Sequence, residues 1–257
     1  MLIVRLLLLL TAASACAQDP FEIHVYEYEP LKRGAFTYEA HLNYVLKGTT
    51  AFTGPVAPMQ DQLHFTSEIT AGLSEQFAVG VMLLTARRPD HSLEYAGWRV
   101  LPHFYAPRSW NLPFDLGLVT EFSFQRTTFE ENSRRVEVRP IIEKHIGRLE
   151  LTGNPVFERA LHGPGTSDGW AFEPAGRVGW QAYKKFTPSV EYYSSWGPVA
   201  NFPAFNQQVH QIVPGGDLKI GERLTWSFGA GCGLSDTGSR LVIKSRFEWA
   251  FGRKVDP

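Results

Sequence analysis

The sequence has very little cysteine, almost no net charge and no long apolar run after its first residues. Its two cysteines are Cys16 and Cys232, and its formal net charge is -1. A near-neutral chain lacks the basic surface that binds nucleic acid, so we expect no nucleic-acid partner. No later stretch approaches the roughly 18 apolar residues of a membrane helix. The chain also lacks linkers and low-complexity tracts, which favours a single domain.

The first 17 residues have the features of a secretory signal peptide. Arg5 supplies a positive charge, a short apolar run ends at Leu10, and small residues at 15–17 suit cleavage before Gln18. Lipidation of Cys16 is the alternative, but the residue three positions earlier is Ala13 rather than leucine. Cleavage leaves Cys232 alone, so the exported chain is expected to have no internal disulfide.

Apolar and polar residues alternate through the rest of the chain. A period of two is typical of β-strands, in which successive side chains point to opposite faces. The alternation predicts about twelve strands, over residues 36–47, 63–73, 77–83, 98–104, 114–124, 136–143, 148–158, 172–181, 190–196, 209–220, 224–234 and 240–251. Pro188 and Pro214 are expected to interrupt the ninth and tenth of these strands.

The connections between the predicted strands alternate in length. Those after even-numbered strands are mostly tight, as at 74–76 and 220–222, and those after odd-numbered strands are mostly longer, as at 48–61 and 197–206. Short turns at one end and long loops at the other are typical of a transmembrane barrel with both termini in the periplasm. Aromatic residues near the strand ends fit the two aromatic girdles of such a barrel. The fold class is therefore an all-β, antiparallel, up-and-down transmembrane barrel.

The polar faces of the strands carry charges of both signs, which the barrel would turn toward its lumen. One hypothesis is a selective solute path, and the alternative is a set of salt bridges that merely fills a narrow barrel. The predicted lumen-lining residues are Glu39, Glu68, Arg99, Asp115, Glu121, Arg139, Glu143, Glu173, Arg177, Glu191, Lys244, Arg246 and Glu248.

The sequence predicts no catalytic residue, no metal site and no cofactor. His41, His64 and His103 fall on lumen-facing positions, but a lone lumen histidine is more often part of a hydrogen-bond network than a metal ligand. The glycines at 229–233 alternate along a strand with no helix after them, so they do not form a phosphate loop. Serine- and histidine-bearing segments such as 193–195 and 160–163 do not reproduce the motif of the outer membrane phospholipase family.

The predicted organisation is a signal peptide (1–17), a periplasmic leader or lumen plug (18–33), an outer membrane barrel (34–252) and a C-terminal tail (253–257). In residues 19–33, Phe21, Ile23 and Val25 alternate with polar neighbours, and the leader and plug alternatives stay open. The terminal aromatic run of residues 247–251 resembles the carboxy-terminal signal of outer membrane proteins, although residues 252–257 follow it.

The mature chain also resembles outer membrane β-barrels near the phenol-degradation meta-pathway transporter family. The resemblance rests on barrel pattern, length and three short runs, Pro-Gly-Gly-Asp-Leu from Pro214, Leu-Ser-Asp from Leu234 and Arg-Leu-Val from Arg240. It implies uptake of small, including aromatic, molecules.

We therefore expect a narrow passive channel in a Gram-negative outer membrane and no enzyme activity. Its expected partners are membrane lipid, small solutes and, during biogenesis, periplasmic chaperones and the barrel-assembly machinery. The alternatives are an outer membrane enzyme acting on lipid or envelope components, and a soluble periplasmic β-barrel that binds a small ligand.

Overall fold

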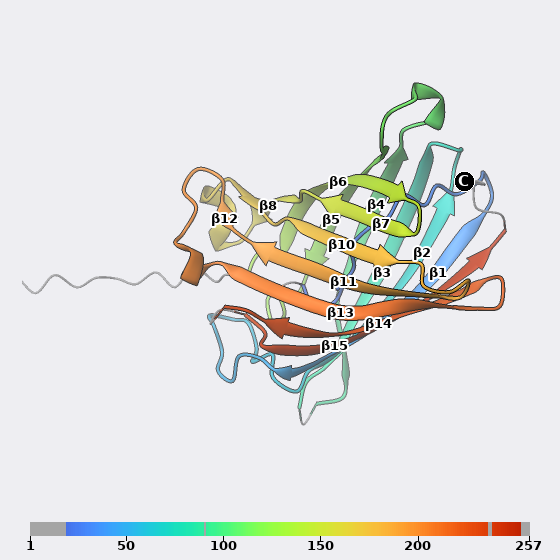
Figure 1. Ribbon diagram of the computed structural model, residues 1–257. Helices are drawn as coiled ribbons and strands as arrows, with labels where there is room; N and C mark the ends of the chain where they lie inside the picture. The colour runs from blue at the N-terminus through green and yellow to red at the C-terminus, as the bar shows by residue number, and fades with distance from the viewer. Residues whose placement is uncertain (1–18, 90, 236–237, 253–257) are drawn as a thin grey trace, which may run out of the picture.

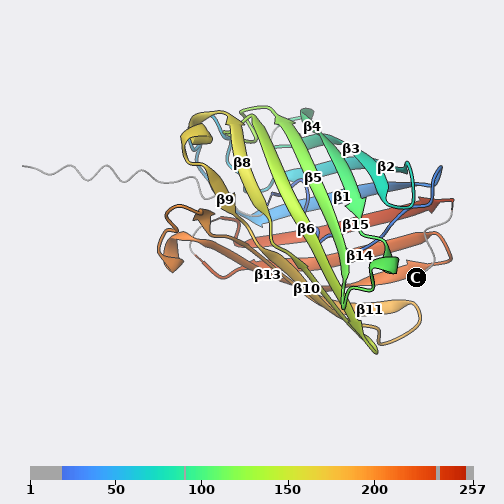
Figure 2. The ribbon, with the colours of Figure 1, turned by 90° about the horizontal axis from the view of Figure 1, so that it is seen from above.

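The computed structural model describes residues 19–89, 91–235 and 238–252. The predicted signal peptide, Cys16 and the tail at 253–257 lie outside these residues. Within the described residues, fifteen strand segments form a closed antiparallel barrel of twelve strands, because three of the barrel strands are each divided into two segments (Figures 1 and 2). The predicted fold class and strand number are confirmed.

The strands follow the order of the sequence around the barrel. They are β1 (Phe36–Lys47), β2 (Leu63–Gly72), β3 (Phe77–Arg87), β4 (Leu93–Tyr105), β5 (Asp115–Gln125), β6 (Arg134–Ile146), β7 (Leu149–Asn154), β8 (Phe157–His162), β9 (Trp170–Phe172), β10 (Ala175–Trp180), β11 (Phe186–Ser195), β12 (Gly197–Pro198), β13 (Val209–Ile220), β14 (Leu224–Gly233) and β15 (Leu241–Phe251). The first and last strands, β1 and β15, pair with each other, so the sheet leaves no free edge there.

The prolines act differently from the sequence-based expectation. Strands β11 and β13 run without a break through Pro188 and Pro214, which belong to pairs two positions apart in the same ladder. Two of the three divided strands instead break at Pro155, between β7 and β8, and at Pro174, between β9 and β10, whereas the third breaks at Trp196, between β11 and β12. A proline lacks the N–H that a ladder needs, so its effect depends on whether that position would donate a hydrogen bond. Sequence alone does not reveal this.

Short connections gather at one end of the barrel and long ones at the other. We call these the turn end and the loop end. The connections after β2, β6 and β13 are short, whereas those after β1, β5, β8 and β12 are long. One connection at the turn end departs from the pattern: residues 106–114 join β4 to β5 and contain the 3-10 helix η1 (Arg108–Trp110).

Three short 3-10 helices lie in the connections: η1, η2 (Pro164–Ser167) and η3 (Phe205–Gln207). Among the described residues, no helix has the length and apolar character needed to cross a membrane.

The outer face of the barrel is apolar and the inner face is largely polar. On β2, for example, the outward Ile69 is 56% exposed, whereas the adjacent inward Glu68 is 2% exposed. Exposed apolar residues also occur on β3, where Val81 and Leu83 point outward and are about half exposed. Exposed apolar side chains over a whole barrel surface are typical of a lipid-facing wall rather than a water-facing one.

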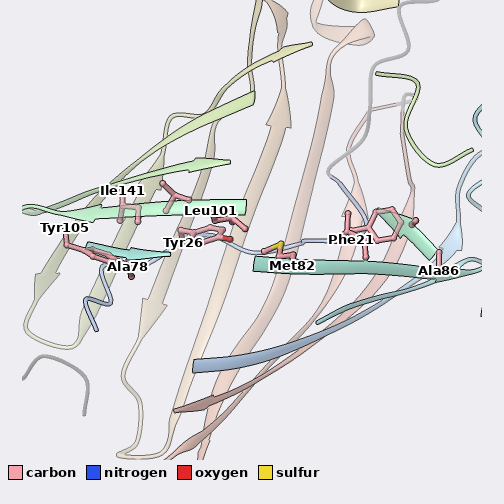
Figure 3. Packing of buried hydrophobic residues seen from close by; sticks show 11 residues of the cluster. Phe21, Tyr26, Ala78, Met82, Ala86, Leu101, Tyr105 and Ile141 are labelled. Atoms are coloured by element: carbon pink, nitrogen blue, oxygen red, sulfur yellow. The ribbon is translucent and has the colours of Figure 1, made fainter. Parts of the chain in front are cut away.

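Residues 19–31, which we call the interior segment, run through the inside of the barrel. Phe21 and Tyr26 pack against inward apolar side chains of β3, β4 and β6, among them Met82, Leu101 and Ile141 (Figure 3). Ile23 and Val25 pack against a second inner cluster from β1, β11, β13 and β15. The inner wall therefore has apolar patches where the interior segment contacts it, a feature that the predicted polar lumen did not include.

Candidate functional site

The lumen is the candidate functional site, and its geometry starts from the backbone of the interior segment. This segment forms no strand ladder, so its N–H and C=O groups need other partners. Asn154 accepts from the N–H of Tyr26 at 2.7 Å and donates to the Tyr26 carbonyl at 3.0 Å. Asn43 donates to the carbonyl of Pro20 and Thr66 to that of Phe21. Wall side chains thus replace the missing ladder.

Acidic side chains of the interior segment bind arginines of the wall. Arg99 on β4 contacts Asp19, and its Nη1 donates to Glu22 Oε2 at 2.9 Å. Glu22 also accepts from Arg139 on β6 at 3.2 Å. Further along the segment, Glu27 accepts from Arg177 on β10 at 2.8 Å. Charge-assisted hydrogen bonds of this kind are about twice as strong as neutral ones, so the segment is fixed at several depths.

The structure places all of the predicted lumen residues on inward positions. Ten of them are buried: Glu68, Arg99, Glu121, Arg139, Glu143, Arg177, Glu191, Lys244, Arg246 and Glu248. Glu39 and Glu173 are half-buried, and Asp115 lies at the turn end, where it accepts from Arg108.

Some of the predicted residues meet each other directly. Arg246 Nη1 lies 2.8 Å from Glu39 Oε2, Lys244 contacts Glu191, and Arg99 Nε lies 3.2 Å from Glu121 Oε1. Others bind groups outside the predicted set. Glu143 accepts from the N–H of Tyr28, and Glu173 accepts from Ser195.

Several lumen residues were missed by the sequence-based prediction. They are the wall residues Arg135, Glu137, Glu150, Glu158 and Asp217, and the acids Asp19, Glu22 and Glu27 of the interior segment. The period-of-two rule would have found Glu137 and Arg135, since they share a face with Arg139. No local signal would have found the interior acids, because their partners lie far away in sequence.

Among the described inward residues, carboxylates outnumber basic groups. The acidic wall residues are Glu39, Glu68, Glu121, Glu137, Glu143, Glu150, Glu158, Glu173, Glu191, Asp217 and Glu248, and the basic ones are Arg99, Arg135, Arg139, Arg177, Lys244 and Arg246. The interior segment adds further acids. Buried carboxylates in excess of their basic partners either take up protons or attract cations.

A small cavity of about 40 Å³ lies inside the barrel beside the interior segment, bordered by Glu22, Arg99, Arg139 and Tyr193 among others. A volume of this size holds only a few water molecules, because one water needs roughly 10–15 Å³ by this measure. This cavity, bordered by the wall and by the interior segment, is thus too small for a solute much larger than water.

Comparisons with known proteins find the fold but no close relative. No protein-family model and no curated protein matches the chain. An outer membrane channel from Pseudomonas putida F1 is similar, with a TM-score of 0.56 and 10% identity over 90% of this chain and 100% of that one. The KdgM porin, solved with disordered oligogalacturonate, has a TM-score of 0.51 and 10% identity over 84% and 99% of the two chains.

A third similar structure is the outer membrane protein Omp33 of Acinetobacter baumannii, with a TM-score of 0.50 and 8% identity over 88% of this chain and 100% of that one. At identities this low the likeness concerns the fold. The chain therefore has the fold of a bacterial outer membrane β-barrel.

Proposed function

We propose that this protein is a narrow passive channel for small solutes in a bacterial outer membrane, and that the interior segment restricts its lumen. The observation that carries the proposal is a closed barrel whose charged inner wall surrounds a segment held by Arg99, Arg139 and Arg177.

The interior segment is held firmly enough to restrict passage. Phe21, Ile23 and Val25 are 1%, 3% and 0% exposed. Burying a side chain of this size stabilises a structure by about 1.5–3 kcal/mol. Together with the ion pairs, this burial favours the occupied lumen, and under this proposal solutes pass when the segment shifts. The surplus of carboxylates favours cations and neutral solutes over anions.

Conductance in planar bilayers tests this proposal. We expect low conductance from the intact mature chain and several-fold higher, cation-selective conductance after deletion of residues 19–31. Because the deletion removes packing, a full-length variant with Phe21→Ala, Ile23→Ala and Val25→Ala should show the same change more weakly. Phe52→Ala, in an exposed loop, is the matched control. A correctly folded deletion variant that stays impermeable would overturn the proposal.

We infer a relation to the phenol-degradation meta-pathway transporter family, with small aromatic molecules as solutes. The inference is supported by the Pro-Gly-Gly-Asp-Leu run, which lies on β13, and by the Arg-Leu-Val run that leads into β15. Liposome swelling compares phenol and catechol with sugars of similar size. Equal rates for the aromatic solutes and the sugars would argue against this solute class.

Residence in the outer membrane is part of the proposal and is tested by fractionation. The protein should sediment with the outer membrane and require detergent for extraction, as its exposed apolar wall implies. Recovery from the periplasm without detergent would instead favour the soluble ligand-binding barrel.

A lipid hydrolase at the barrel rim is the second candidate, favoured by one contact. At the loop end, Ser133 Oγ and His162 Nδ1 lie 2.9 Å apart, a pairing that can activate a serine nucleophile. Hydrolysis of phospholipid by the wild type, lost in both Ser133→Ala and His162→Ala, would support this activity. Absence of hydrolysis from the folded wild type would remove it.

A further inference from the structure

Three inward side chains of β1 and β2 converge on one point of the lumen wall. Glu39 and Glu68 face each other directly across the β1–β2 ladder, and His41 lies two residues beyond Glu39 on the same face. Their donor atoms lie within 4.8 Å of one another. His41 Nε2 is 3.4 Å from Glu39 Oε2 and 3.9 Å from Glu68 Oε2.

The histidine nitrogen at this point has no hydrogen bond. His41 is 1% exposed, and its Nε2 is buried without a hydrogen-bond partner. A buried polar atom in this condition destabilises the fold. The nitrogen is directed between two carboxylate oxygens at distances too long or too poorly aligned for hydrogen bonding. An ion placed between them would satisfy all three groups.

Other contacts orient the carboxylates. Thr70 Oγ1 donates to Glu68 Oε1 at 2.7 Å, which leaves Glu68 Oε2 as the oxygen nearer to His41. Arg246 Nη1 donates to Glu39 Oε2 at 2.8 Å and offsets part of the negative charge. Both carboxylates are therefore held in place by groups outside the cluster.

The local charge still favours a cation. Glu68, Glu39 and Glu248 stand side by side in register across β2, β1 and β15, and like charges directly opposite each other destabilise a sheet. Arg246 is the basic side chain of β15 beside this row, opposite His41. At the site itself, Glu39 and Glu68 stand opposite each other beside the guanidinium of Arg246, and a divalent cation would relieve the repulsion between the two carboxylates.

We propose that Glu39, His41 and Glu68 form a binding site for a divalent transition-metal cation of the Zn²⁺ type. One imidazole nitrogen with two carboxylate oxygens suits such ions, whereas Mg²⁺ and Ca²⁺ prefer oxygen ligands alone. Ligands on a tetrahedral Zn²⁺ lie roughly 3.3 Å apart, so the 3.4 and 3.9 Å distances from His41 need a small contraction, and the two carboxylate oxygens, within 4.8 Å of each other, must also approach.

The interior segment offers a further ligand. The ring of His24 lies 6.1 Å from the ring of His41, centroid to centroid, and is the imidazole that the segment brings to this part of the wall. The site goes beyond channel activity, because the three wall residues bind the ion whether or not the lumen conducts.

Calorimetric titration of Zn²⁺ into the folded, chelator-treated mature chain tests the site. The chain carries no histidine tag and is held in detergent. We expect one Zn²⁺ per barrel, with affinity at least tenfold lower in His41→Ala and in the near-isosteric Glu68→Gln. His64→Ala is the matched control, since His64 is 2% exposed and both of its ring nitrogens also lack hydrogen bonds. It should bind Zn²⁺ like the wild type.

A second readout separates binding from folding. Zn²⁺ should raise the unfolding temperature of the wild type and of His64→Ala but not of His41→Ala or Glu68→Gln. If His41→Ala does not fold, Glu68→Gln carries the test alone. No Zn²⁺ uptake by the wild type, equal uptake by Glu68→Gln, or equal affinity for Ca²⁺ would each overturn the proposal.

Discussion

Arg99 shows what a single residue does in this lumen. It is 2% exposed and contacts Asp19 and Glu22 of the interior segment as well as Glu121 of β5. The period-of-two pattern predicts that Arg99 points inward. It does not predict the partners, because Glu22 lies 77 residues away in sequence. Which charges meet across a lumen depends on closure and register, which no local pattern encodes.

Substitution of Arg99 should be costly. Arg99→Met keeps much of the side-chain volume but leaves buried carboxylates without their guanidinium, and breaking a buried pair in this way destabilises a protein by about 3–5 kcal/mol. Arg108→Ala is the control, because Arg108 is 48% exposed and its pair with Asp115 should contribute no more than about 1 kcal/mol. Equilibrium unfolding in urea compares the two, and similar losses would contradict the assignment of Arg99 as a buried anchor.

At the scale of elements, the strands were predictable, whereas for residues 19–31 the sequence did not decide between a periplasmic leader and a lumen plug. Alternation extended over ten or so residues defines both the strand and its two faces, as β1 and β15 show. Residues 19–31 carry the same alternation, yet they form no ladder and lie inside the barrel. Their position depends on inner apolar patches contributed by several distant strands, such as Met82 and Leu101. A period of two therefore does not distinguish a strand of the barrel wall from a segment that lies inside the barrel.

Gly72 on β2 makes room for the backbone that follows the interior segment as the chain leaves the lumen. A Cβ at Gly72 would lie 2.3 Å from the carbonyl oxygen of Lys32, so the chain can pass β2 only where a side chain is missing. Gly72→Ala should push this backbone away, loosen the interior segment and raise conductance. Gly153→Ala is the control, since nothing lies within 4 Å of that position. Equal conductance and equal protease resistance of the two variants would contradict this role of Gly72.

For the whole molecule, the apolar outer wall is the feature that distinguishes lipid from water as its surroundings. Alternation and sorted loops predict this wall, and the exposed Ile69, Val81 and Leu83 match it. The occupation of the lumen by residues 19–31 could not be predicted, since it depends on the space and the inner apolar patches that closure creates. The structure leaves a cavity of about 40 Å³ beside the interior segment.

Because the outer wall faces lipid, a charged side chain added to it should lower the free energy of unfolding by an amount that depends on its depth in the membrane. Val81→Lys, in the middle of β3, should destabilise the barrel in vesicles by about 2–4 kcal/mol, and Ile220→Lys, at the end of β13, by about 0–1 kcal/mol. Both side chains point outward and are about half exposed. Denaturant unfolding from lipid vesicles measures the difference. A water-facing wall would instead give changes within about 0.5 kcal/mol at both positions.

The seam between β1 and β15 has a consequence for the order of assembly. These strands come from opposite ends of the described chain and pair along their full length, with Phe36 opposite Phe251. The ring can therefore shut only after the last strand has been delivered. The interior segment lies just before β1 in sequence, so it enters the lumen from the turn end, where β1 begins. A segment left outside when the seam forms could reach the lumen afterwards only through a mouth of the barrel, because the closed wall offers no free edge.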